Sequence, residues 1–380
     1  MQLWKQRLTA EGGGVKPRKR RRKEDLTSPE SIDSLAAGLD TGKEDQAECL
    51  PSRIARYSRA KERALAMRDY LMTLGESSAV KAAGLLQDCG NYLHFRHYFT
   101  VNQVRLHAAC FCKQHLICPL CAIRRGSKTL EAYLKRFRAV QAERPELKPY
   151  LMTFTVRDSA GLEERMLHLL HAFQVLKDRR RNFHAGVRGA PWTEFAKVAG
   201  AVGSYEVKRG KGSGLWHPHL HMVALCASPP DQADLRREWE AITGDSFMVD
   251  VRPFHEGQDP AQGFMEVFKY AVKFGDLSLS DNWAVAQYLR GSRLLFSLGV
   301  FRGVQVPEAL TDEPLDDLPY FDLFYRHFAG LGYSMTGEIP PDNGPREYLQ
   351  TPLSRKDVKL LLAYRHRRSM HPDWSAEGDG

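Results

Sequence analysis

The chain has 380 residues and a formal net charge of +9, from 55 lysine and arginine against 46 aspartate and glutamate residues. It contains no apolar run long enough to cross a bilayer, and no signal-peptide segment follows Met1, which argues against a membrane or secreted protein and predicts a cytosolic one. The basic excess suits a polyanionic partner such as nucleic acid.

The first fifty residues predict a disordered basic arm. Lys16–Lys23 reads KPRKRRRK, with seven basic residues in eight, and Gly-, Ser- and Asp-rich sequence surrounds it. Such an arm can bind the phosphates of any DNA, or it can simply be a solvated run of like charge. A nuclear-import signal has the same composition, so this stretch does not identify the host.

The next segment combines helices with clustered cysteines. Residues 52–74 and 128–144 have apolar residues at helical spacing with basic residues between them, which predicts two helices. Between them, Cys110, Cys112, His115, Cys118 and Cys121 lie within twelve residues. In a reducing compartment this clustering favours a metal over disulfides, and the two-residue spacing of Cys118 and Cys121 predicts a structural zinc site with four ligands.

After Pro149 short strand-like runs begin. Strands are predicted over residues 150–156, 201–207 and 219–225, with a helix over 162–181 after the first. Three glycines between the second and third runs indicate a hairpin with a long loop. This order predicts an α+β domain built on an antiparallel sheet.

The third strand carries a histidine pattern. In WHPHLHMVAL, Trp216–Leu225, His217, His219 and His221 alternate with other residues, and alternate residues of a strand share one face. His219 and His221 therefore project side by side, as a two-imidazole metal site requires. Glu206 on the preceding strand is the candidate third ligand, although it can equally be an exposed carboxylate, because the register across the loop is not fixed by the sequence.

Downstream, GFMEVFKYAVKFGD predicts a helix that ends near Gly275. Glu266 and Tyr270 are four residues apart and so share one helix face, with Lys269 and Lys273 beside them. Such a pair alone is usually a surface pair. Next to a metal it becomes a candidate nucleophile site, because a phenol with a pKa near 10 needs a cation to ionise at neutral pH.

Three motifs in this order resemble those of plasmid rolling-circle replication initiators, which belong to the HUH superfamily of endonucleases. They are LMTFT at residues 151–155, HPHLHMV at 217–223 and EVFKYAVK at 266–273. The segments CGNYLHFRHY, FCKQHLICPLCAIRRGSK and GSRLLFSLGVFRG extend the resemblance from Cys89 to about Tyr333. In conjugative relaxases the tyrosine precedes the histidines, whereas here it follows them. Two-tyrosine initiators carry a second tyrosine one turn away, where this chain has Glu266 and Phe274.

The resemblance implies an antiparallel HUH nuclease core, ferredoxin- or RRM-like, with flanking helices and a small zinc-binding element. We expect a helical and zinc-binding DNA-contact region over 51–145 and the HUH endonuclease domain over 146–340. The resemblance does not extend to the two ends of the chain, where a disordered basic arm is expected over 1–50 and a C-terminal helix and tail over 341–380. It also implies a cytoplasmic bacterial protein of unknown oligomeric state.

The resemblance further implies that Tyr270 attacks a phosphodiester at the plasmid's double-strand origin, single-stranded at the nick and next to a hairpin. The products are a 5'-phosphotyrosine and a 3'-hydroxyl primer. Lys273 would stabilise negative charge, and Glu266 would activate water for a terminating hydrolysis. A host helicase and a DNA polymerase are the implied partners, and no membrane is involved.

Two metals are expected. The resemblance implies Mg²⁺ or Mn²⁺ on His219, His221 and Glu206, whereas imidazole ligands alone favour Mn²⁺ or Zn²⁺. We expect Mg²⁺ or Mn²⁺ there. For zinc, the resemblance points to Cys112, Cys118 and Cys121 with Cys89, and Cys110 or His115 are the substitutes.

Six basic residues are the expected DNA contacts. They are Arg124, Arg125 and Lys128 after the cysteines, and Lys208, Arg209 and Lys211 in the hairpin. Two other functions fit parts of the pattern. One is a transposase or mobilisation nuclease with the same chemistry, and the other is a non-catalytic, zinc-containing DNA-binding regulator.

Overall fold

The computed structural model describes residues 50–255, 257, 259–268, 277–315 and 318–341. Residues 1–49, which hold the predicted basic arm, and residues 342–380, which hold the predicted C-terminal helix and tail, lie outside the described residues. Among the described helices, none combines the length and apolarity needed to cross a lipid bilayer.

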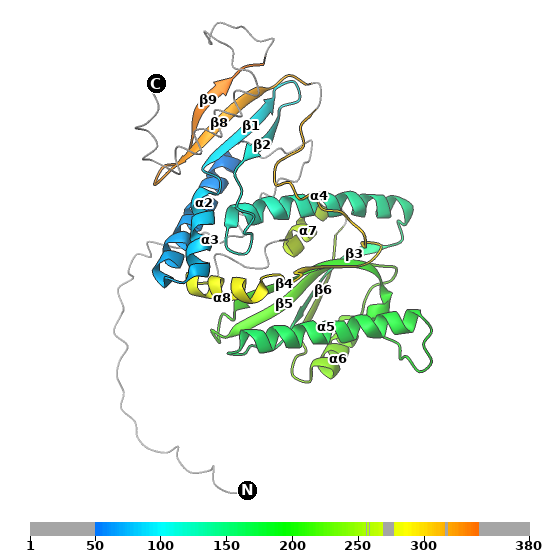
Figure 1. Ribbon diagram of the computed structural model, residues 1–380. Coiled ribbons are helices and arrows are strands. Elements are labelled where there is room, and N and C mark those ends of the chain that lie inside the picture. The colour runs from blue at the N-terminus through cyan, green and yellow to red at the C-terminus, as the bar shows by residue number, and fades with distance from the viewer. Residues whose placement is uncertain (1–49, 256, 258, 269–276, 316–317, 342–380) are drawn as a thin grey trace, which may run out of the picture.

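Two antiparallel sheets organise the described chain (Figure 1). The first has the strand order β2-β1-β8-β9 and packs beside two helices. Its elements are α2 (Leu50–Leu74), α3 (Ser77–Asp88), β1 (Tyr92–Tyr98), β2 (Gln103–Ala109), β8 (Phe321–Phe328) and β9 (Gly332–Ile339). We did not expect β1 or β2 from the sequence. The division into domains stays a prediction, but β8 pairs with β1, so residues 321–339 belong to the sheet of the N-terminal region.

The second sheet has the order β6-β3-β5-β4-β7. Its strands are β3 (Lys148–Thr155), β4 (Val198–Arg209), β5 (Trp216–Cys226), β6 (Val249–Pro253) and β7 (Leu295–Gly299). β5 lies at the centre and pairs antiparallel with both β3 and β4. The three predicted strands and the hairpin are thus present, each within a longer strand.

Helices cover both faces of this sheet (Figure 1). On one face, Leu220 and Met222 of β5 join the core that includes α5 (Leu162–His184) and α6 (Gln232–Thr243). On the other, Val223 and Leu225 join a core with α4 (Pro119–Glu143) and α7 (Pro260–Phe268). The remaining helices are a short 3-10 turn (Glu194–Lys197) and α8 (Leu279–Leu289).

The α+β prediction is confirmed, and the architecture is consistent with an HUH nuclease core. The predicted helices over 52–74 and 162–181 correspond to α2 and α5. The helix predicted over 128–144 begins earlier, at Pro119. Proline suits the first turn of a helix, where its missing N–H needs no partner. As a result α4 runs directly out of the cysteine segment.

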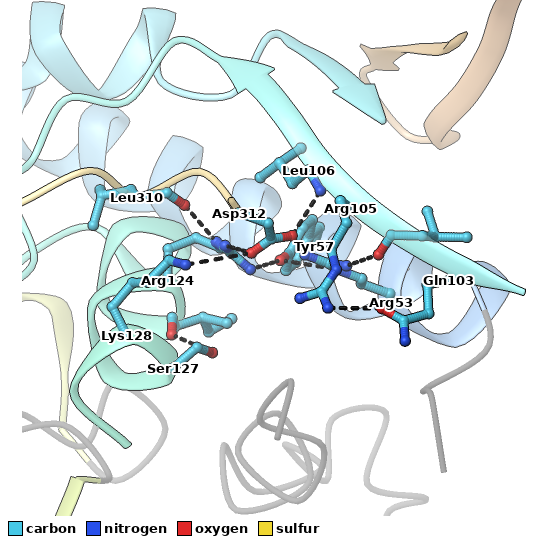
Figure 2. Close-up of polar contacts among 12 residues, drawn as sticks. Arg53, Tyr57, Gln103, Arg105, Leu106, Arg124, Ser127, Lys128, Leu310 and Asp312 are labelled. Carbon is cyan, nitrogen blue, oxygen red and sulfur yellow. Dashed lines mark hydrogen bonds and ion pairs between the residues drawn. The ribbon is translucent and has the colours of Figure 1, made fainter. Parts of the chain in front are cut away.

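A buried carboxylate joins α2, β2, α4 and the segment between β7 and β8 (Figure 2). Asp312 forms ion pairs with Arg53 and Arg124 and accepts a hydrogen bond from the backbone N–H of Leu106. Arg124 also donates to the carbonyl of Leu310 and to the hydroxyl of Tyr57. Burial alone would raise the pKa of Asp312, but the two guanidinium groups hold it well below its usual range.

We expect Asp312→Asn to lower the free energy of unfolding by about 3–5 kcal/mol, because it removes the buried negative charge with which both guanidinium groups pair. Urea denaturation of the full chain measures the change. Asp69→Asn is the control, since Asp69 pairs with Arg68 at the surface, and it should cost less than about 1 kcal/mol. Equal effects of the two substitutions would contradict the role of Asp312.

Candidate metal centre and nucleic-acid site

The β4–β5 hairpin brings one carboxylate and two imidazoles together. In its register Glu206 lies opposite His219, and Ser204 lies opposite His221. The Nε2 atoms of both histidines are 3.4 Å from Oε2 of Glu206, and the three candidate ligand atoms lie within 4.8 Å of one another. The structure therefore gathers all three predicted ligands of the catalytic metal, which we call the Glu-His-His cluster.

Polar contacts of the Nδ1 atoms orient both imidazoles. His219 Nδ1 is 3.2 Å from the carbonyl of His217, and because a carbonyl only accepts, Nδ1 carries the proton and Nε2 keeps a lone pair. His221 Nδ1 is 2.8 Å from the Thr153 hydroxyl on β3, which can hold that ring in the same way. Outer contacts of this kind fix metal-binding histidines in metalloproteins. The sequence analysis missed Thr153 as a site residue, although it stands opposite His221 in the β3–β5 register.

The cluster fits a cation. Burial lowers the pKa of His219 to about 4, although Glu206 acts in the opposite direction, so this imidazole is neutral at pH 7. A neutral Nε2 lone pair then faces a carboxylate oxygen across 3.4 Å, and a bound cation between them would remove the repulsion. Ligands about 2.1 Å from one metal ion are separated by about 3.0–3.4 Å, which agrees with the observed distances.

The third histidine of the pattern has a different partner. His217 lies beside His219, but its Nδ1 is 2.5 Å from Oδ1 of Asp158. Asp158 also accepts a hydrogen bond from Ser213 in the hairpin loop. His217 is not among the residues that gather around Glu206.

Helix α7 covers the face of the sheet that carries the Glu-His-His cluster. Val267 of α7 packs in the same core as Val223, which follows His221 by two residues on β5. The hydroxyl of Ser204 donates to the carbonyl of Val267. Glu266 is half-buried on α7, and the described helix ends at Phe268. Tyr270 and Lys273, the predicted nucleophile and charge-stabilising residue, lie outside the described residues.

Four thiols converge where the end of α3, the cysteine loop and the start of α4 meet. Cys89, Cys112, Cys118 and Cys121 form this cysteine cluster. Three of its Sγ–Sγ distances are 3.5, 3.5 and 3.6 Å. Zinc–sulfur bonds of about 2.3 Å place tetrahedral ligands about 3.8 Å apart, so the spacing suits a zinc ion. Cys110 and His115 are both exposed, and neither belongs to the cluster.

The structure places some of the six predicted DNA contacts in the interior and others at the surface. Arg124 is fully buried in the Asp312 network, so its predicted role as a phosphate contact is corrected. Lys128 is only 5% exposed, and its Nζ lies 3.9 Å from Oδ1 of Asp312. Arg209 pairs with Asp281 and lies 3.5 Å from the Trp216 ring centroid. By contrast, Lys211 is exposed.

The other two predicted contacts remain partly accessible. Lys208 and Arg125 are half-buried, and Arg125 donates to the carbonyl of Pro307. No local pattern separates these surface cations from the buried Arg124, because its partner Asp312 is 188 residues away in the chain.

The fold and the two clusters define an α+β protein with two candidate metal-binding sites, and comparisons with known proteins give its relatives. Residues 103–229 match the family described as replication protein. The protein named Protein rep from Streptococcus pneumoniae serotype 2 is 25% identical over 250 residues, which cover 62% of this chain and 74% of that protein. Protein rep from Lactiplantibacillus plantarum is 25% identical over 224 residues, covering 53% of this chain and 65% of that protein. No solved structure matches.

These findings confirm the resemblance to replication initiator proteins. The family match spans β2 to the end of β5, so it includes both histidines of the Glu-His-His cluster and three cysteines of the cysteine cluster. Both relatives carry the name Rep. The chain is therefore similar in sequence to replication proteins over the region that carries both clusters.

We expect Thr153→Val to weaken Mn²⁺ binding about 10- to 100-fold, because it removes the hydroxyl that orients His221. Isothermal titration calorimetry of the full chain measures the affinity. Thr155→Val, on the same strand but bonded to the carbonyl of Met248, should bind Mn²⁺ as the unmodified chain does. The orienting role is contradicted if the two variants bind equally well.

We expect Cys118→Ser to lose the bound zinc and to lower the melting temperature, because it breaks the four-thiol set. Elemental analysis of purified full-length protein gives the zinc content per chain. Cys110→Ser should keep its zinc, since Cys110 lies outside the cluster. Zinc retained by Cys118→Ser, or lost by Cys110→Ser, would argue against this ligand set.

Proposed function

We propose that this protein is a rolling-circle replication initiator that nicks one strand at a plasmid double-strand origin through a 5'-phosphotyrosine intermediate. The observation that carries the proposal is the position of the Glu-His-His cluster on the sheet face that α7 covers. The described part of α7 ends at Phe268, and Tyr270 follows two residues later in the sequence. A cation-binding site and the candidate nucleophile therefore belong to neighbouring segments.

In the nicking step, the Tyr270 oxygen attacks the scissile phosphorus after losing its proton. The bond between phosphorus and the 3'-oxygen breaks, and that oxygen takes up a proton to become the 3'-hydroxyl primer. Glu206, His219 and His221 would hold Mg²⁺ or Mn²⁺, which supplies Lewis-acid polarisation of the phosphate when bound. Lys273 stabilises negative charge on the phenolate or the phosphate.

At the end of a round, Glu266 acts as the general base. Four residues before Tyr270 in the sequence, it takes a proton from a water molecule that attacks the phosphodiester at the regenerated nick site and breaks its bond to the 3'-oxygen. The 3'-hydroxyl so formed then attacks the phosphotyrosine, which closes the displaced circle and releases Tyr270. Hydrolysis leaves no covalent intermediate, so termination is irreversible. A half-buried Glu266 on α7 is compatible with this role.

The partners follow from the reaction. Origin DNA must be single-stranded at the nick, and extension from the 3'-hydroxyl requires a helicase and a DNA polymerase from the host. The cysteine cluster would hold zinc as a structural ion beside the nuclease sheet. The match to replication proteins favours initiation over transposition or plasmid mobilisation, and the Glu-His-His cluster favours an enzyme over a non-catalytic regulator.

We expect Tyr270→Phe to abolish formation of a covalent protein–DNA adduct, because it removes the attacking oxygen. The substrates are labelled single-stranded oligonucleotides that tile the DNA carrying this gene, incubated with the full chain and Mn²⁺. A denaturing gel separates adduct from free DNA.

Tyr288→Phe on α8 is the matched control, and it should retain the adduct. Adduct formation by Tyr270→Phe would assign the nucleophile to another residue. Absence of cleavage across the whole tiled set by the unmodified chain would reject the proposed enzyme.

A further inference from the structure

A large basic cleft lies at the β7 edge of the second sheet. Its volume is 1160 Å³, and residues of α4, α5, β4, β7 and the segment after β7 line it. Six of the described lining side chains are lysine or arginine, and one is a carboxylate, Asp178. The six are Arg125, Lys177, Arg180, Arg181, Arg293 and Arg302. Only Arg125 was among the DNA contacts expected from the sequence.

The positive charge of this cleft is largely uncompensated. Asp178 pairs with Arg181 at 2.9 Å and its charge also acts on the neighbouring Lys177, so one carboxylate of the described lining faces six cations. Arg180 is held in place because its Nε donates to the carbonyl of Val198 at 2.8 Å. Burial, and then the charge of Arg302, lower the pKa of Arg180. These two guanidinium groups therefore repel each other, and an anion bound between them would relieve the repulsion.

The basic cleft adjoins a second, smaller cavity. The two share Arg125, Arg293 and Leu295, and the smaller one has a volume of 250 Å³. The smaller cavity is lined by Ser204 and by the end of α7 at Val267 and Phe268. Ser204 stands opposite His221 in the β4–β5 register, so the smaller cavity adjoins the strand pair that carries the Glu-His-His cluster.

A loop between cysteine ligands lines the smaller cavity. His115 and Leu116, which lie between Cys112 and Cys118, contribute to this lining. Because Cys112 and Cys118 anchor both ends of this loop in the cysteine cluster, the cluster fixes part of the cavity wall. Arg293 and Leu294, just before β7, also line the cavity.

We propose that the basic cleft binds the sugar-phosphate backbone of the origin DNA that adjoins the nick. The inference rests on the proposed function, and it assigns the site that holds DNA beyond the scissile phosphate. Lys177, Arg293 and Arg302 contact phosphates, and Arg180 supplies a fixed charge at the cleft wall. Such contacts position DNA without reading its sequence, so the cleft sets register and affinity, while the metal centre performs the cleavage.

The test compares a triple variant, Lys177→Gln/Arg293→Gln/Arg302→Gln, with the unmodified chain. Fluorescence anisotropy with a labelled origin oligonucleotide that extends about 20 nucleotides on each side of the nick gives the affinity at several salt concentrations. Three lost phosphate contacts should lower the affinity at least about 10-fold and reduce the slope of log affinity against log salt by about 2–3.

A charge-matched control removes three exposed arginines elsewhere, Arg144→Gln/Arg237→Gln/Arg252→Gln. Arg252 lies on β6, at the opposite edge of the same sheet. This control should keep most of the affinity and the salt slope. Equal losses in the two triple variants, or no loss in the cleft variant, would overturn the proposal.

The binding measurement requires no cleavage, so the two proposals fail separately. If the unmodified chain forms no Tyr270-dependent adduct but the cleft variant still loses affinity and salt slope, the proposed nicking function is rejected and the DNA-binding cleft stands. If cleavage depends on Tyr270 but the cleft variant binds long DNA normally, the cleft assignment alone is rejected. Circular dichroism melting of the cleft variant should match the unmodified chain, because the three side chains are exposed or half-buried.

Discussion

The antiparallel register of β4 and β5 is the constraint on which the candidate site depends. It sets Glu206 opposite His219 and brings the donor atoms of Glu206 and both histidines within 4.8 Å of one another. A slip of one residue in this pairing would turn Glu206 to the other face of the sheet, among the apolar residues that face α5. The same register aligns Ser204 with the end of α7, so one strand pair fixes the cluster relative to the helix that precedes Tyr270.

The metal centre lies between two structural supports. On one side, β3 supplies the Thr153 hydroxyl that orients His221. On the other, α4 extends from the cysteine cluster across the sheet face and packs against α7. Because α4 begins at Pro119 between two cysteine ligands, a metal bound to the thiols would also fix the start of the helix that supports α7. The two ligand clusters therefore belong to one connected framework.

The Asp312 network serves a similar purpose for the N-terminal sheet. It ties α2, α4 and β2 to the segment that leads from β7 to β8, so the chain returns from the second sheet to complete the first. Arg124 is buried in this network, whereas six lysine and arginine side chains with a single carboxylate line the cleft beside β7. The structural arginines are buried beside a counter-charge, whereas the arginines of the cleft remain available for a polyanion.

The sequence alone determined the features that depend on neighbours in the chain. Period-two alternation predicted the shared face of His219 and His221, helical spacing predicted α2 and α5, and short cysteine spacing predicted a metal ligand set. The tertiary structure alone decided the rest: the side of the sheet on which Glu206 lies, the burial of Arg124 and the pairing of β1 with β8. The physical reason is that local periodicity specifies which face a residue occupies, whereas partners far apart in sequence are selected by the packing of the whole chain.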